Sequence, residues 1–564
     1  MSKGLRKYLA MTLAAFTLAL SVSGCGNSQQ TESTASSASQ AAVSSTSVAN
    51  TPDPVKLQFY VPSPTANVND LQVVLDEFSK QTKDTLNTTI NFNFTTFDDI
   101  GNKVSLKLAS GEQIDSAFSA QWTNPSLMSM VSKGQLVNLD KYFTDDNYSG
   151  LKKAFTQDYL KNNSFKDAKG ESHVYGIPFT HGFSGGGAIY YRLDLAEKYG
   201  IGQLKSIEDL TKYYDAILAN EKGMIPLSII GQQDTASDII WSLSTTAVKK
   251  HNFDTTTALT GMTGIAAAIR DDGTSYVAKT VNYRNDGEFM KLLPSEISSM
   301  DPNFGFTTAV EWYKKGYLEK DIMNQKDNMG QFMAGRAASY NSTLDVYADR
   351  AQQLEKAIPG AKLGYMVTDA GLRTETPEAI GSDFKAWNFA CIPVTSKNVD
   401  RVMQFYNWLF ADQKNHDLFE FGIEGKHWTA EGTTKYSIPE GLDTATSYNF
   451  PAFTLSWNPT MVRYSSKTPD DVVKKLNMLG DTNFFYKSPS AGFSFVSDTV
   501  KTEQAKLNEL HSNLQAVGNG LIDDVTGFFE KQQKAYDKAG FQKYLEELEK
   551  QYNEFLKANP YEGQ

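Results

Sequence analysis

Cysteine is almost missing from this chain, because Cys25 and Cys391 are the only two among 564 residues. Two cysteines so far apart indicate neither a disulfide framework nor a metal knuckle nor a redox pair. Histidine is scarce as well, and its six residues are scattered, so that no metal site is indicated. The sequence also lacks a nucleophile elbow, a His-Glu-x-x-His motif, a P-loop and a dinucleotide fingerprint. These absences remove the enzyme and cofactor classes that such motifs identify.

Positive charge is in deficit, with 54 Lys and Arg against 65 Asp and Glu, which gives a formal net charge of −11. No basic stripe or arginine-rich segment is present, so nucleic acid is not expected as a partner. A glycosidase needs two carboxylates beside one bond, and among 65 acidic residues some pair will always be close. The sequence therefore neither supports nor excludes that activity.

The N-terminus carries a targeting pattern. Lys3, Arg6 and Lys7 precede an apolar run over 8–20 that is too short to be kept as a membrane-spanning helix. Ser21-Val22-Ser23-Gly24-Cys25 follows and resembles a bacterial lipobox, which implies cleavage before Cys25 and a thioether-linked lipid on its sulfur. We therefore expect a lipoprotein signal peptide over 1–24. The alternative is an ordinary secretory signal followed by a chance cysteine.

Residues 25–54 are rich in Ser, Thr, Ala and Gln and have almost no large apolar side chain. Such a segment buries too little surface to offset its ordering entropy, so a flexible linker behind the lipid anchor is expected. The remaining 55–564, about 510 residues, is long for one compact domain and suggests two lobes. In this body Cys391 lies in an apolar stretch and is expected to behave as a small buried hydrophobe.

The start of the body alternates strand and helix patterns. Residues 55–61 alternate apolar and polar before Pro62, and Leu71, Val74, Leu75 and Phe78 recur at helical spacing. A second strand is expected over 90–94 and a second helix over 103–109. This order predicts βαβ units and a mainly parallel sheet, that is, an α/β fold.

Motifs further along resemble a known family, the sugar-binding type of extracellular solute-binding protein of ABC transporters. They lie at 108–122 with 134–140, at 175–178 with 188–201, at 332–340, and at 409–428, which includes Glu-Gly-Lys-His-Trp. Residues 456–459, 488–503 and a final helix with Phe541, Leu545, Leu548, Tyr552 and Phe555 on one face are similar to an additional C-terminal domain of unknown function. The resemblance covers about 55 to 558.

The resemblance implies a two-lobed periplasmic-binding-protein-like α/β fold with a ligand cleft between the lobes. The motif positions predict a first lobe over about 55–178 and 335–385. A second lobe is predicted over about 188–334 and 388–564, including a C-terminal extension from about 430. Gly185-Gly186-Gly187, next to the first crossing between lobes, is expected to serve as a hinge or to allow close backbone approach.

Sugar recognition needs flat apolar faces for the ring and planar polar groups for the hydroxyls. On position and residue type, the candidate binding residues are Tyr60, Gln121, Trp122, His181, Trp241, Asn341, Asp345, Trp387, Glu424, His427 and Trp428. Each has a structural alternative: Tyr60 as core, His181 as a hydrogen-bonded loop residue, and 424–428 as a helix terminus that holds the lobes together. Trp312 and Trp408 lie at core spacing and are expected to be structural, and Trp457 is favoured less than the other tryptophans.

The expected function is capture of an extracellular carbohydrate, most simply an oligosaccharide, and its delivery to ABC permease subunits. No catalysis and no cofactor are expected. The protein is expected to be a monomer tethered through Cys25 to the outer face of the cytoplasmic membrane of a Gram-positive bacterium. A surface sugar sensor or adhesin with the same fold, and a surface glycoside hydrolase, are the alternatives.

Overall fold

The structure, a computed structural model, describes residues 51–63, 68–120, 123, 125–255, 265–442 and 446–561. The expected signal peptide, the lipidation site Cys25, and the candidates Gln121 and Trp122 lie outside these residues. In the described part of the chain, no helix combines the length and the apolar character needed to cross a membrane.

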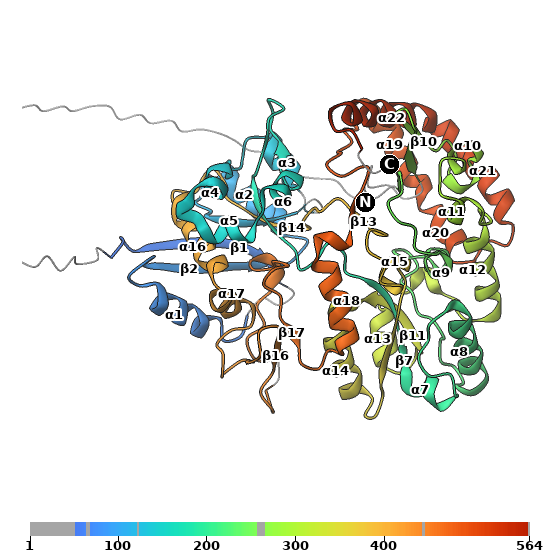
Figure 1. Ribbon diagram of the computed structural model, residues 1–564, viewed down its shortest axis with the longest axis horizontal. Coiled ribbons are helices and arrows are strands. Elements are labelled where there is room, and N and C mark those ends of the chain that lie inside the picture. The colour runs from blue at the N-terminus through green and yellow to red at the C-terminus, as the bar shows by residue number, and fades with distance from the viewer. Residues whose placement is uncertain are drawn as a thin grey trace, which may run out of the picture. The chain divides into compact units, whose positions relative to one another are not determined.

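The first lobe is built on a mixed sheet with strand order β2-β1-β3-β14-β6 (Figure 1). β1 and β2 pair in parallel from Val55 opposite Thr88 to Pro62 opposite Thr95, whereas β14 runs antiparallel to both of its neighbours. The strands are β1 (Val55–Pro62), β2 (Thr88–Thr95), β3 (Ser116–Ser119), β6 (Gly176–Phe179) and β14 (Asn388–Cys391). The expected opening strands and parallel pairing are confirmed.

Side chains from β1 enter cores on both faces of this sheet. Phe59 packs with α1, α16 and α17 on one face, and Tyr60 packs with α2 and α3 on the other. In α1 the predicted positions Val74, Leu75 and Phe78 are buried, so the helical spacing is confirmed. The helices of the lobe are α1 (Leu71–Thr82), α2 (Ile100–Ala109), α3 (Leu127–Ser132), α4 (Asp140–Thr144), α5 (Ser149–Ala154), α6 (Gln157–Asn162), α16 (Val399–Ala411) and α17 (Gln413–Glu420). Short strands β4 (Phe165–Lys166), β5 (Ser172–His173), β15 (Thr429–Glu431), β16 (Lys435–Ser437) and β17 (Tyr464–Ser465) complete it.

The second lobe has an antiparallel sheet of order β11-β7-β12 and a separate sheet of order β10-β9-β8. The strands are β7 (Gly187–Arg192), β8 (Phe253–Thr255), β9 (Ala266–Ile269), β10 (Ser275–Val277), β11 (Ser339–Thr343) and β12 (Leu363–Val367), with a parallel pair β13 (Gly381–Ser382) and β18 (Tyr486–Lys487). The helices between them are α7 (Leu193–Lys198), α8 (Ile207–Asn220), α9 (Ala236–Ser244), α10 (Gly287–Met290), α11 (Ser295–Ser298), α12 (Phe304–Lys315), α13 (Asn328–Met333), α14 (Tyr347–Ala357) and α15 (Ala370–Arg373). Buried tyrosines such as Tyr213 and Tyr214 fill the core beneath β7.

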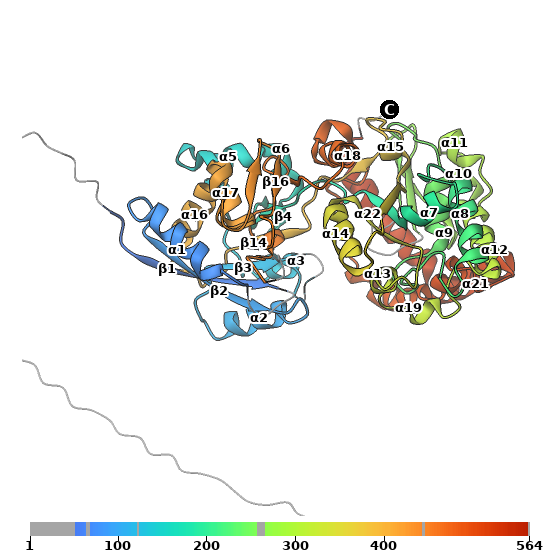
Figure 2. The ribbon, with the colours of Figure 1, turned by 90° about the horizontal axis from the view of Figure 1, so that it is seen from below.

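The C-terminal helices belong to the second lobe. Figures 1 and 2 show α18 (Asp470–Gly480) beside α14, and the two share one apolar core. The helices α19 (Lys501–His511), α20 (Asn513–Gly518), α21 (Val525–Ala539) and α22 (Phe541–Ala558) pack on β9, β10 and α12. In α22, Leu545, Leu548 and Tyr552 are fully buried, so the apolar face predicted for the last helix is confirmed.

Three described segments carry the chain from one lobe to the other. Residues 180–186 join β6 to β7, residues 383–387 join β13 to β14, and residues 466–469 join β17 to α18. Phe183 and Phe384, from the first two segments, pack edge to face with each other and with Phe485. An aromatic contact therefore ties the first two connections to the second lobe.

The lobe boundaries differ from the sequence prediction after residue 334. Residues 335–385 were predicted to return to the first lobe, but β11 and β12 both pair with β7 in the second. Residues from 388 were predicted to enter the second lobe, but β14 forms the inner strand between β3 and β6, and residues up to 465 pack with the first. The prediction was wrong here because a short apolar strand pattern does not specify which sheet it joins.

Candidate functional site

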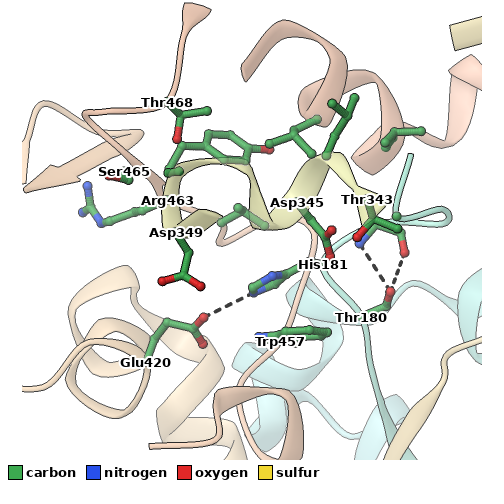
Figure 3. A pocket seen from close by; sticks show the side chains of 18 of the residues that line it. Thr180, His181, Thr343, Asp345, Asp349, Glu420, Trp457, Arg463, Ser465 and Thr468 are labelled. Atoms are coloured by element: carbon green, nitrogen blue, oxygen red, sulfur yellow. Dashed lines mark hydrogen bonds and ion pairs between the residues drawn. The ribbon is translucent and has the colours of Figure 1, made fainter. Parts of the chain in front are cut away.

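A cavity of about 490 Å³ lies where all three connecting segments meet the lobes, and we refer to it as the junction cavity. Thr180 to Gly182, Ser184 and Gly185 line it from the first segment, Trp387 from the second and Thr468 from the third. Glu420, Tyr436 and Trp457 line it from the first lobe. Asp345 and Asp349 line it from the second (Figure 3). A ligand held here would touch both lobes and the segments that join them.

Glu420, the last residue of α17, is the buried acid of the cavity wall. Its Oε1 lies 3.3 Å from Nε2 of His181, and its other oxygen accepts a hydrogen bond from the Ser456 hydroxyl. Burial alone would raise the pKa of Glu420, but the hydrogen bond and charge of His181, then the charge of His416, outweigh it and lower the pKa. The Glu420 carboxylate is thus held ionised by His181 of the first connecting segment and by Ser456 and His416 of the first lobe.

A second buried ion pair stands behind Glu420. Nε of Arg463 donates to Oδ2 of Asp417 at 2.7 Å, and Oδ1 of Asp417 lies 3.1 Å from Nδ1 of His416. Nε2 of His416 in turn lies 3.9 Å from Oε2 of Glu420. The chain of charged groups fixes the first-lobe wall because each buried group has a partner.

Aromatic faces line the same cavity. The His181 ring stacks on Trp457 with centroids 4.1 Å apart and planes 25° apart. Figure 3 shows the stacked pair beneath Asp345, with Glu420 and Asp349 facing each other across the space. Trp387 is 69% exposed, an unusual state for the largest apolar side chain. Flat rings beside carboxylates and Arg463 are the groups that hold a sugar ring and its hydroxyls.

The glycine-rich segment forms the second-lobe rim of the cavity. Gly186 has φ +65°, and a Cβ there would lie 2.7 Å from a methyl group of Leu479. The backbone oxygens of Gly185 and Gly186 accept from the Leu344 N–H at 3.0 and 2.9 Å. The close backbone approach expected for the glycines is therefore present, and it fixes the turn that carries Asp345.

Among the described candidates from the sequence, His181, Asp345 and Trp387 line the junction cavity. Tyr60 is buried in the core of the first lobe. Asn341 is engaged within the second lobe, where its amide donates to Asp234 and accepts from Asn328, both at 2.9 Å.

The segment 424–428 does not line the junction cavity. Nδ1 of His427 accepts from the Ile423 N–H at 2.9 Å, and its Nε2 lies 3.0 Å from Asp70 at the start of α1. The Trp428 indole donates to the Gly422 carbonyl at 2.9 Å. His427 and Trp428 are buried and Glu424 is exposed. The three residues close the end of α17, as their structural alternative proposed, but they do so within the first lobe and do not join the two lobes.

Trp241 lies on a different cavity. This space of about 430 Å³ is in the second lobe, and the guanidinium of Arg284 lies over the Trp241 ring. Trp312 is buried in the second-lobe core and Trp408 packs against the first-lobe core, so both are structural as expected.

Sequence reasoning missed Glu420, Asp349 and Arg463 as cavity residues, and it was wrong to rank Trp457 below the other candidate tryptophans. A signal for Glu420 was available, because His416 precedes it by four residues and the two share a helix face. Arg463 and Trp457 lie in irregular chain, where no periodicity shows the direction of a side chain.

Metal-ligating side chains gather at one place among the described residues. Asp167, Glu171 and His173, around the β4–β5 turn, have ligand atoms within 4.8 Å of one another. Asp140 lies 2.7 Å from Nδ1 of His173, and the backbone N–H groups of Lys169 and Glu171 donate to Asp167. Protein donors thus already occupy part of this cluster, and none of its residues lines the junction cavity.

Comparisons with known proteins agree with the two-lobed fold. Residues 63–415 match the family described as bacterial extracellular solute-binding protein, and residues 489–557 match a domain of unknown function. A carbohydrate ABC transporter substrate-binding protein of Streptococcus pneumoniae is 22% identical, over 98% of this chain and 99% of its own length.

Solved structures share the architecture. An N-glycan transport solute binding protein from Streptococcus pneumoniae superposes with a TM-score of 0.64 at 18% identity, covering 90% of this chain and 99% of its own. A solute-binding protein from Bifidobacterium longum infantis, described as binding HMO, gives a TM-score of 0.56 at 15% identity, with 88% and 98% covered. At these identities the likeness concerns the fold.

Proposed function

The chain belongs to the bacterial extracellular solute-binding proteins, and we propose that it captures a carbohydrate outside the cell and delivers it to an ABC permease. The observation that carries the proposal is the junction cavity. It combines the stacked rings of His181 and Trp457 with the Glu420 carboxylate and with Asp345 and Asp349 from the other lobe. The names of the relatives, a carbohydrate substrate-binding protein and an N-glycan binding protein, support the same ligand class.

The proposed mechanism is closure of the lobes on the sugar. A ligand that contacts Trp457 and Glu420 on one lobe and Asp349 on the other binds best when both walls are close. Such a ligand shifts the population toward the closed state by its difference in affinity for the two states. The closed surface is then recognised by permease subunits, and another subunit hydrolyses ATP.

We extend the proposal to the placement of the protein. A lipid on Cys25 and a flexible segment behind it would tether a monomeric binding body to the outer face of the cytoplasmic membrane. The lipobox-like Ser21 to Cys25 pattern supports the tether, and the family supports the extracellular side. Labelling with radioactive palmitate, lost in Cys25→Ala, tests the anchor independently of sugar binding.

A glycoside hydrolase would require an acid and a nucleophile or base among the cavity carboxylates. Glu420 is a poor general acid because its lowered pKa keeps it ionised near neutral pH. It is also hydrogen-bonded to His181 and Ser456. Binding without turnover is therefore the function that the cavity supports better. A sensor or adhesin would use the same sugar site and differs in the protein that receives the closed form.

The test is a thermal-shift and calorimetric screen of the purified protein with neutral and acidic oligosaccharides, peptides and amino acids. A ligand that binds only the folded protein stabilises it by about 2.7 kcal/mol at a hundredfold excess over Kd. Trp457→Ala should weaken sugar binding about tenfold or more, whereas Trp457→Phe, which keeps a ring, should weaken it less. Stabilisation by peptides alone, or release of shorter sugars during incubation, would refute the proposal.

A further inference from the structure

The second cavity, which we call the Arg284 cavity, lies within the second lobe. It is lined by Trp241 of α9, Tyr283 and Arg284 of the turn between β10 and α10, His251 beside β8, and Tyr486 of β18. Its volume of about 430 Å³ is close to that of the junction cavity, and the two share no lining residue. Its volume is within the range of small-molecule sites, and its wall combines aromatic rings with three aspartates and Arg284.

Arg284 is held in place by rings instead of by acids. Its guanidinium carbon lies 3.7 Å from the Trp241 ring centroid and 4.6 Å from that of Tyr283. Among the described residues no carboxylate oxygen lies within 4.0 Å of this guanidinium. Its Nε is buried without a hydrogen-bond partner, although a buried donor of a charged group costs about 1–3 kcal/mol when it is left unpaired.

The acids around the cavity are already engaged. Asp254 accepts from the hydroxyls of Ser488 and Ser490 and from the Ser490 N–H, at 2.6 to 2.8 Å. Asp238 accepts from the Thr235 hydroxyl at 2.7 Å.

Two further groups of the cavity wall, Asp369 and His251, form no ion pair with the arginine. Asp369 accepts from the Leu372 N–H at 2.9 Å, and burial raises its pKa. Burial lowers the pKa of His251 to about 4, so its ring is neutral near pH 7. Arg284 is therefore the cavity's charged group with donors to spare.

A guanidinium stacked on an indole keeps its N–H groups in one plane, at the edge of the stack. That planar edge matches the two oxygens of a carboxylate, and the stack has already removed much of the side chain's freedom. A carboxylate presents two acceptor oxygens to the guanidinium, one of whose donors the protein leaves unpaired, whereas a neutral hydroxyl presents only one oxygen.

We propose that the Arg284 cavity is a subsite for an acidic saccharide, in which Arg284 binds the carboxylate of a sugar acid and the surrounding rings contact its apolar face. The inference rests on the proposed carbohydrate function and narrows its ligand class. Tyr486 is an aromatic ring of the cavity wall that lies outside the Arg284 stack.

The test is isothermal titration of the purified protein with three oligosaccharides of equal length and linkage. One is a uronic acid oligomer, one its neutral counterpart and one a sulfated counterpart. The proteins are the wild type, Arg284→Gln, Arg284→Lys and the matched control Arg336→Gln, which removes an exposed arginine of the same lobe that lines neither cavity. Melting temperatures show that each variant is folded, and Arg284→Lys keeps the charge if the glutamine variant does not fold.

The wild type should bind the uronic acid oligomer at least tenfold more tightly than its neutral counterpart. Arg284→Gln should remove that preference, Arg284→Lys should keep part of it, and Arg336→Gln should leave it unchanged. Equal affinity of the wild type for the acidic and neutral oligomers overturns this inference and leaves the proposed function standing. A preference for sulfate over carboxylate overturns the assignment to sugar acids, and binding of none of the three overturns both proposals.

Discussion

In the junction cavity, Glu420 meets His181, Ser456 and His416, whereas Arg284 in the second cavity stacks on two aromatic rings and its Nε has no hydrogen-bond partner among the described residues. In the wall of the junction cavity, each buried charge already has a partner within the protein. Its charges hold its geometry, and a ligand adds contacts to a surface that is already built. In the Arg284 cavity, stacking on aromatic rings positions the guanidinium, and its unpaired hydrogen-bond donor is left for a ligand. A charge that serves the fold and a charge that serves a ligand are therefore distinguished by their partners, not by their residue type.

Among the variants that test this comparison, Glu420→Ala is expected to have the largest effect on the free energy of unfolding. The change removes the carboxylate that His416 and Ser456 contact, while both residues stay buried. Removal of one member of a buried charged network lowers the free energy of unfolding by about 4 kcal/mol. Urea unfolding at pH 7 measures the loss. The control Glu424→Ala removes an exposed acid four residues later and should change stability by less than about 0.5 kcal/mol. A loss below about 1 kcal/mol for Glu420→Ala would contradict a structural role for its charge.

The next largest effect is expected in the pH dependence of the free energy of unfolding, through His251 in the wall of the Arg284 cavity. The pKa of His251 is lowered in the folded protein to about 4 from an ordinary 6.5, so the unfolded chain binds the extra proton first. The stability that His251 contributes is therefore complete above pH 6.5 and is lost as the pH falls toward 4, by up to about 3 kcal/mol. Urea unfolding of the wild type and His251→Gln between pH 7 and 4 should show a steeper decline in the wild type. Parallel curves would argue against a buried neutral imidazole.

Glu420 acts over a lower pH window than His251. Its pKa is lowered on folding, so the stability from its charge is present above the ordinary glutamate value of 4.5 and is lost as the pH falls through the folded value. The stability difference between the wild type and Glu420→Gln should therefore narrow only below about pH 4.5. A difference that narrows already between pH 7 and 5 would contradict the depressed pKa.

A smaller effect is expected at Asn519, which links the C-terminal helices to the loop before α9. Its side chain accepts from the Ala236 N–H and donates to the Gly231 carbonyl, both at 3.0 Å, and it is fully buried. Asn519→Ala should cost about 2 kcal/mol because those backbone groups lose their partners. Asn559→Ala, at the exposed end of α22, is the matched control and should be near neutral. Equal losses in the two variants would contradict this link between the C-terminal helices and the loop before α9.

The smallest effect is expected from Trp241→Leu in the absence of ligand. Loss of the stack with Arg284 removes a cation–π contact of about 0.5–1 kcal/mol. Thermal unfolding of the wild type, Trp241→Leu, Arg284→Gln and the double variant forms a cycle that isolates the pair. A coupling of zero would mean that the stack does not hold the guanidinium.

The fold class could be predicted from the sequence because it depends on patterns among neighbouring residues. The periodicity of α1 and α22 and the alternation of β1 depend on neighbouring residues, and all three are found as predicted. The assignment of β11 and β14 to lobes was wrong because it depends on partners 150 to 270 residues away, such as Tyr190 opposite Tyr340 and Phe118 opposite Ala390. Pairing at that distance leaves no pattern within a strand of four or five residues.

The site was predicted in part for the same reason. His181, Asp345 and Trp387 lie on or next to connecting segments, which the resemblance located. Glu420 and Arg463 reach the cavity through a network whose members are close only after folding. His427 and Trp428 were chosen for residue type, yet their hydrogen bonds to Asp70 and Gly422 use the same groups to close a helix end.

The position of β14 has a consequence for the order in which the protein can be assembled. β14 lies between β3 and β6, and the described strand β6 has no other neighbour in the sheet. A chain emerging from the ribosome or the export channel therefore cannot complete its first sheet until residue 391 has appeared, after most of the second lobe's β7, β11 and β12 sheet is already available. The first lobe is therefore still incomplete when the β7, β11 and β12 sheet of the second lobe has been made, so a truncated chain ending before residue 388 would present an open sheet edge at β3 instead of an independent N-terminal lobe.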